Sequence, residues 1–192
     1  VVPTPRVFEW KLLHHPILES SCVALDGVLC RRPTETETAD ASRYREFVET
    51  VEPRAIPTER VGWVVAARPE SYRDETEAWL EEHDVEYEHL MMGGGTAAGE
   101  TGPLSDPVEF KSRAYRSTDA GLFVEGSMTT ARTVCERSRK PVYCYAACEM
   151  VAPGRLARTH QYTTESLSEF ADDPVGFSRK AGEFAASRLE LP

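Results

Sequence analysis

Short apolar runs alternate with amphipathic stretches along the middle of this 192-residue chain. The runs over 22–25, 61–67, 120–124 and 141–146 are apolar throughout, as is typical of parallel strands covered on both faces. A further strand over 85–92 alternates apolar and polar residues. The stretches over 42–51, 72–83, 108–117 and 127–139 carry apolar residues at helical spacing. This alternation predicts an α/β fold with a three-layer, Rossmann-like parallel sheet of about five strands and right-handed crossovers.

The pattern also predicts how the chain is divided. We expect a lead-in segment over 1–21 that packs on the outside, an α/β domain over 22–150 and a C-terminal helical appendage over 151–192. The polar stretch 31–42 is expected to be a loop that serves as a minimal cap. The glycine-rich stretch 93–107 is expected to be a flexible linker, because no helix follows closely enough for its glycines to cradle phosphate.

Composition excludes some partners. A net charge of −10 argues against general nucleic-acid binding, and no run approaches the roughly 18 apolar residues of a membrane span. Five cysteines without a C-x-x-C pair indicate a reducing compartment, so a cytoplasmic location is expected. The 22 basic residues include four lysines, which together with the acidity suits either a salt-loving host or a high-GC genome.

Polar and charged residues follow three of the predicted strands. Asp26 and Gly27 follow the first run, Arg68 follows the second, and Glu125 and Gly126 follow the fourth strand. Open α/β sheets build their sites at the carboxyl ends of the strands. We therefore expect these residues to lie at one edge of the sheet.

The stretch 22–30 (CVALDGVLC) resembles the first motif of the haloacid dehalogenase-like phosphohydrolases, a hydrophobic strand followed by Asp-x-Asp-Gly. The resemblance covers roughly residues 20–150 and implies that family's fold. It also implies a nucleophile and metal ligand at position 24, where this chain has Ala24, and a general acid/base at Asp26. A methyl group cannot attack phosphorus.

The remaining motifs of that family are also incomplete. Ala66 stands where the resemblance implies a Ser or Thr hydroxyl for the phosphoryl group, and Arg68 beside it either contacts an anion or serves packing. Lys111 stands near the place of the family's third motif, with a solvated helix lysine as the alternative. The fourth motif implies acidic magnesium ligands; Glu125 supplies one and Gly126 none.

The residues that the resemblance leaves for a site form three groups. The residual catalytic groups are Asp26 and Lys111. The ligand-binding residues are Gly27, Arg68 and Ser127. The weak magnesium ligands are Asp26 and Glu125. The cofactor expectation is accordingly none or weakly bound magnesium, because magnesium depends on a few well-placed oxygens.

A narrower resemblance involves the run 7–37. It looks like the start of the haloacid dehalogenase-like domain that follows a phosphoribosyltransferase in some archaeal and bacterial proteins. This resemblance implies a phosphoribosyltransferase domain or self-association as a partner, beside a phosphorylated small molecule.

Three functions remain open from the sequence. The first is a non-catalytic domain that binds a phosphorylated ligand or a partner. The second is a working magnesium-dependent phosphatase, either with Ala24 as the natural residue or with Ala24 introduced by engineering. The third is a purely structural or assembly domain. The lost carboxylate and hydroxyl favour the first, a pseudoenzyme.

Overall fold

The computed structural model describes residues 12–93 and 106–153. The strands are β1 Ser21–Ala24, β2 Val61–Pro69, β3 Tyr87–Gly93, β4 Leu122–Glu125, β5 Val142–Cys144 and β6 Glu149–Val151. The α-helices are α2 Glu35–Thr38, α3 Ala41–Thr50, α4 Arg73–Glu82, α5 Pro107–Ser117 and α6 Met128–Ser138, and short 3-10 helices are η1 Pro16–Ser20 and η2 Glu70–Tyr72. The expected helical appendage beyond residue 153, and most of the expected linker, lie outside the described residues.

The six strands form one sheet in the order β3-β2-β1-β4-β5-β6. Neighbours from β3 to β5 are parallel, whereas β6 pairs antiparallel with β5. The α/β class and the five parallel strands are therefore confirmed. The antiparallel sixth strand was not predicted, because three residues are too few to show a period.

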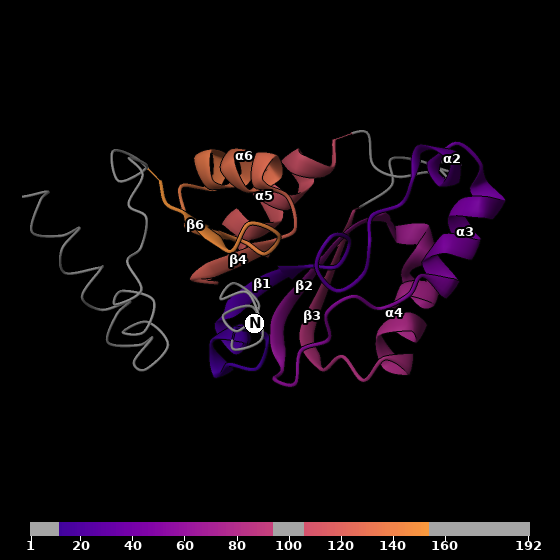
Figure 1. The fold of residues 1–192 in the computed structure, drawn as a ribbon, viewed down its shortest axis with the longest axis horizontal. Coiled ribbons are helices and arrows are strands. Elements are labelled where there is room, and N and C mark those ends of the chain that lie inside the picture. The colour runs from indigo at the N-terminus through magenta and orange to yellow at the C-terminus, as the bar shows by residue number, and fades with distance from the viewer. Residues whose placement is uncertain (1–11, 94–105, 154–192) are drawn as a thin grey trace, which may run out of the picture. The chain divides into compact units, whose positions relative to one another are not determined.

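Helices cover both faces of the sheet. α3 packs on α4 and α5 packs on α6, and Figure 1 shows the two pairs on opposite sides of the strands. The chain leaves β1 toward β2 on one side and later returns to place β4 on the other side of β1. The carboxyl ends of β1 and β4 therefore form a topological switch point, where open α/β sheets place their ligands.

The loop after β1, residues 25–30, is fully or almost fully buried and is here called the Gly27 loop. The strand ends at Ala24, although Leu25 and the later residues Val28 to Cys30 are also apolar. Gly27 has φ +103°, which favours glycine, and its N–H donates to the carbonyl of Cys30 at 2.8 Å. The N–H groups of Leu29 and Cys30 donate to the carbonyl of Leu25. These bonds turn the chain and hold Asp26 at the end of the strand.

Polar caps fix where the helices begin. Asp106 accepts hydrogen bonds from the N–H groups of Val108 and Glu109 at the start of α5, and Ser127 accepts from Thr130 N at the start of α6. The stretch expected to be a loop contains the one-turn helix α2, because Thr34 and Glu37 form a reciprocal capping box.

The lead-in segment contributes to the core. Leu12, Leu13 and Leu18 are at most 4% exposed and belong to the same buried cluster as β1 and β2. These three leucines anchor the lead-in segment in the core, whereas residues 14–17, 19 and 20 are partly or fully exposed. Residues 1–11 lie outside the described part of the chain.

Lys140 closes the C-terminal end of α5. Its Nζ donates to the carbonyls of Tyr115, Thr118 and Ala120 at 2.6–3.3 Å. Replacing Lys140 with Met leaves these carbonyls without that donor. We expect a loss of about 1–3 kcal/mol in the free energy of unfolding, measured by urea denaturation. Arg132→Met on exposed α6 surface is the control, and an equal loss in both variants would contradict this role.

Candidate functional site

Asp26 and Arg68 form a buried ion pair at the carboxyl ends of β1 and β2. The Arg68 side chain is 0% exposed, and its Nη2 donates to Asp26 Oδ1 at 2.7 Å. Its Nε lies 3.2 Å from both carboxylate oxygens. Within the part of the chain that the structure describes, Nη1 of Arg68 has no hydrogen-bond partner. The described residues therefore leave one buried donor of Arg68 unused.

Arg68 also sets the ionisation of Asp26. Burial by itself would raise the pKa of Asp26, but the charge and hydrogen bonds of Arg68 outweigh burial, and Lys111 adds to their effect. The pKa of Asp26 therefore lies below its ordinary value, and the side chain is a carboxylate at neutral pH. Burial raises the pKa of the Cys30 thiol, which donates to Asp26 Oδ1 at 3.4 Å and stays protonated.

Glu125, at the end of β4, is fully buried and holds three donors. Lys111 Nζ donates to Oε2 at 2.6 Å, Arg32 Nη2 donates to Oε1 at 2.5 Å, and Ser127 N donates to Oε1 at 3.1 Å. Lys111 is 4% exposed, so the alternative of a solvated helix lysine is wrong. Arg32 also reaches Thr130 Oγ1 at 3.5 Å.

The loops after β1 and β4 touch through two glycines. A Cβ added to Gly126 would lie 2.1 Å from the carbonyl oxygen of Gly27, so no side chain fits at position 126 while the loops keep this contact. This packing excludes the second acidic side chain that the resemblance implied at position 126.

Two further positions at which the resemblance implied a polar side chain, 24 and 66, are buried in strands. Ala24 ends β1 and Ala66 lies inside β2, both 0% exposed. β2 continues to Pro69, two residues beyond the expected end, and its register shifts between Ala66 and Pro69. This shift is a local irregularity in the pairing of β2 with β3. Arg68 is therefore a strand residue facing Asp26 rather than the first residue of a loop.

The structure brings together the sequence-predicted Asp26 with Arg68, and Lys111 with Glu125 and Ser127. Sequence reasoning missed Arg32, Cys30 and Arg54, which also contact this edge. The one signal in the sequence that could have identified Arg32 is its place in an Arg-Arg pair directly after the Gly27 loop. No family model, curated protein or solved structure matches the chain.

The residues at the switch point do not fit a magnesium ion. Each of the two carboxylates already holds a cationic side chain at hydrogen-bond distance, and Ala24 and Gly126 offer no side-chain oxygen. Among the described residues, no three His, Cys, Asp or Glu side chains gather as a metal-binding group. Three cations, Arg32, Arg68 and Lys111, face two carboxylates, so the arrangement suits an anion better than a cation.

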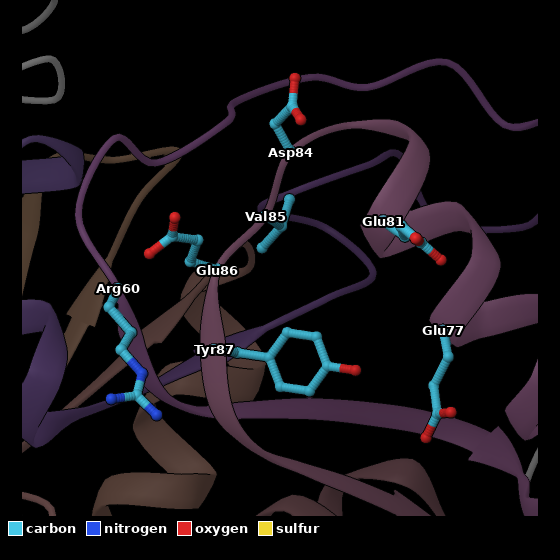
Figure 2. A pocket seen from close by; sticks show the side chains of 7 residues that line it. All are labelled: Arg60, Glu77, Glu81, Asp84, Val85, Glu86 and Tyr87. Carbon is cyan, nitrogen blue, oxygen red and sulfur yellow. The ribbon is translucent and has the colours of Figure 1, made fainter.

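A hollow lined by described residues lies elsewhere. It has a volume of about 540 Å³ and is lined by residues before β2, at the end of α4 and at the start of β3 (Figure 2). Figure 2 shows the Tyr87 ring directed toward Glu77, with Arg60 on the other side of the hollow. Carboxylates dominate this lining, and it lies at the amino end of β2 and β3. We place the candidate site at the switch point because the buried charges converge there.

None of the helices in the described ranges is both long enough and apolar enough to pass through a lipid bilayer.

Proposed function

We propose that this chain is a non-hydrolysing domain of the haloacid dehalogenase-like type that binds a phosphorylated small molecule at the switch point. One observation carries the proposal. The two carboxylates at this edge, Asp26 and Glu125, are each neutralised by a basic side chain of the protein itself, and one further cation remains.

The site lacks the carboxylate nucleophile that hydrolysis through an aspartyl-phosphate requires. Ala24 presents a buried methyl where the family resemblance implies the attacking carboxylate, and Ala66 lacks the phosphoryl contact. Asp26 is bound by Arg68 Nε and Nη2, so proton transfer from it would have to break a buried ion pair. Binding without turnover is the function that these residues support.

The narrower resemblance over 7–37 favours ribose phosphates as the ligand class and a phosphoribosyltransferase domain as the partner. Buried thiols at Cys22, Cys30, Cys135 and Cys144 favour the reducing cytoplasm as the location. A purely structural domain is the alternative, and it predicts no ligand effect.

The proposal predicts binding and no turnover. We expect ribose 5-phosphate or inorganic pyrophosphate to raise the melting temperature and to give a saturable isotherm in calorimetry. We expect no phosphate release from p-nitrophenyl phosphate or nucleotides with magnesium, either by this chain or by Ala24→Asp. In that variant Lys111 and Arg68 still occupy the two existing carboxylates, and Gly126 still supplies no ligand.

Turnover by the chain as it stands would contradict the proposal. Turnover gained by Ala24→Asp alone would show an otherwise intact hydrolase pocket. Absence of any binding would favour the structural alternative.

A further inference from the structure

Two guanidinium groups from different segments contact Gly27. Arg32 follows the Gly27 loop directly, and its Nε would lie 3.0 Å from a Cβ added at Gly27. Arg54 comes from the segment before β2, and its Nη1 lies 3.4 Å from the Gly27 carbonyl oxygen. We call Arg32 and Arg54 the arginine clamp.

Main-chain bonds hold Arg54 in this place. Its N–H donates to the carbonyl of Leu29 at 2.7 Å, and Pro53 forms an isolated bridge with Cys30. The guanidinium lies 5.7 Å from the centre of the Tyr145 ring, in cation–π range. Arg54 is exposed, yet its backbone is fixed to the loop that carries Asp26.

The arginine clamp carries positive charge that the protein does not balance. Among the described residues no carboxylate lies within ion-pair distance of Arg54, and Arg32 shares Glu125 with Lys111. Two like charges at one loop repel each other, and an anion between them removes that repulsion.

Arg32 can leave Glu125 without stranding a buried charge. Glu125 would keep Lys111 on Oε2 and the Ser127 N–H on Oε1. The Arg32 side chain is 44% exposed, whereas those of Arg68 and Lys111 are 0% and 5% exposed. Removing either of the latter two from its partner would leave a buried carboxylate short of its counter-ion, which is strongly unfavourable.

We propose that the phosphate group of the ligand binds between Arg32 and Arg54, and that Arg32 exchanges Glu125 for the phosphate when the ligand arrives. Arg68 and Lys111 keep their carboxylates. The inference rests on the proposed function and moves recognition from the family-motif positions to two arginines outside them. Guanidinium groups suit this task because their paired N–H donors match phosphate oxygens.

The test measures binding of inorganic pyrophosphate and of ribose 5-phosphate by calorimetry, without magnesium. We expect Arg32→Gln and Arg54→Gln each to weaken both ligands about ten- to a hundredfold, since each removes a charge-assisted hydrogen bond. Arg60→Gln is the matched control, because Arg60 is an exposed arginine at the opposite end of β2. We expect this variant to bind both ligands with an affinity within about twofold of that of the unaltered chain. Near-UV circular dichroism checks that all three variants keep the native packing.

The outcomes separate the two proposals. If the unaltered chain binds the ligands and neither Arg32→Gln nor Arg54→Gln weakens that binding, the arginine clamp is overturned and the proposed function stands. An equal loss in Arg60→Gln would also overturn the clamp, because it would show general attraction of anions. No binding by the unaltered chain would overturn both. Weakening confined to the two clamp variants supports the inference.

Discussion

Replacing Arg68 with Met is expected to lower the free energy of unfolding by about 3–5 kcal/mol at pH 7, the largest loss for any single charged residue of the site. Arg68 is completely buried and is the ion-pair partner of Asp26. Without Arg68, the buried carboxylate of Asp26 would keep only the charge of Lys111 among the cations that lower its pKa. Urea denaturation monitored by circular dichroism measures the change.

The pH dependence of this loss identifies its cause. In the unaltered protein the folded-state pKa of Asp26 is lowered, so the pair stabilises the fold above the unfolded pKa of about 3.9 and loses that contribution as the pH falls through the lower folded value. In Arg68→Met, burial instead raises the folded pKa. The variant should therefore recover relative to the parent as the pH is lowered toward 4.

A matched substitution tests whether charge removal alone has this effect. Arg73→Met removes a partly exposed arginine that pairs with Glu70 and Glu77, and we expect a loss below about 1 kcal/mol that varies little with pH. If Arg68→Met were as stable as Arg73→Met at pH 7, the buried pair would not be the stabilising contact described above.

Replacing Gly126 with Ala is expected to lower the free energy of unfolding by about 3 kcal/mol, at the upper end for an added methyl group in packed structure. The new Cβ would meet the backbone of Gly27, with its oxygen at 2.1 Å, and no flexible side chain is there to move aside. The two loops would have to separate. Weakened ligand binding should accompany the loss of stability, because Arg32 and Arg54 both contact Gly27.

Gly121→Ala is the control for Gly126→Ala. An added Cβ at Gly121 meets nothing within 4 Å, so we expect a change within about 0.5 kcal/mol. Equal stability of the two variants in thermal and urea denaturation would show that the loops accommodate a side chain at position 126.

The strands and helices were predictable from the sequence where a run was apolar throughout or where an apolar period extended over two or more helical turns. The runs that became β2 and β4 are apolar throughout, and the helices α3 to α6 show a helical period. The helices α5 and α6 begin at the caps Asp106 and Ser127. The short elements α2 and β6 were missed. Four and three residues do not establish a period, and α2 depends on one capping box.

The site was predictable only as far as its edge of the sheet. The topology rule placed Asp26, Arg68 and Glu125 at one edge, but it did not show which side chains pair there. Arg68 reaches Asp26 across 42 positions, and Arg32 reaches Glu125 across 93. Such pairs follow from the strand order and from the register shift in β2, neither of which leaves a local mark in the sequence.

The contact between Gly27 and Gly126 has a consequence for how relatives of this chain can diverge. No single substitution at position 126 introduces a carboxylate without pushing the two backbones apart. Glycine is therefore the residue that position 126 retains for as long as the two loops keep this contact.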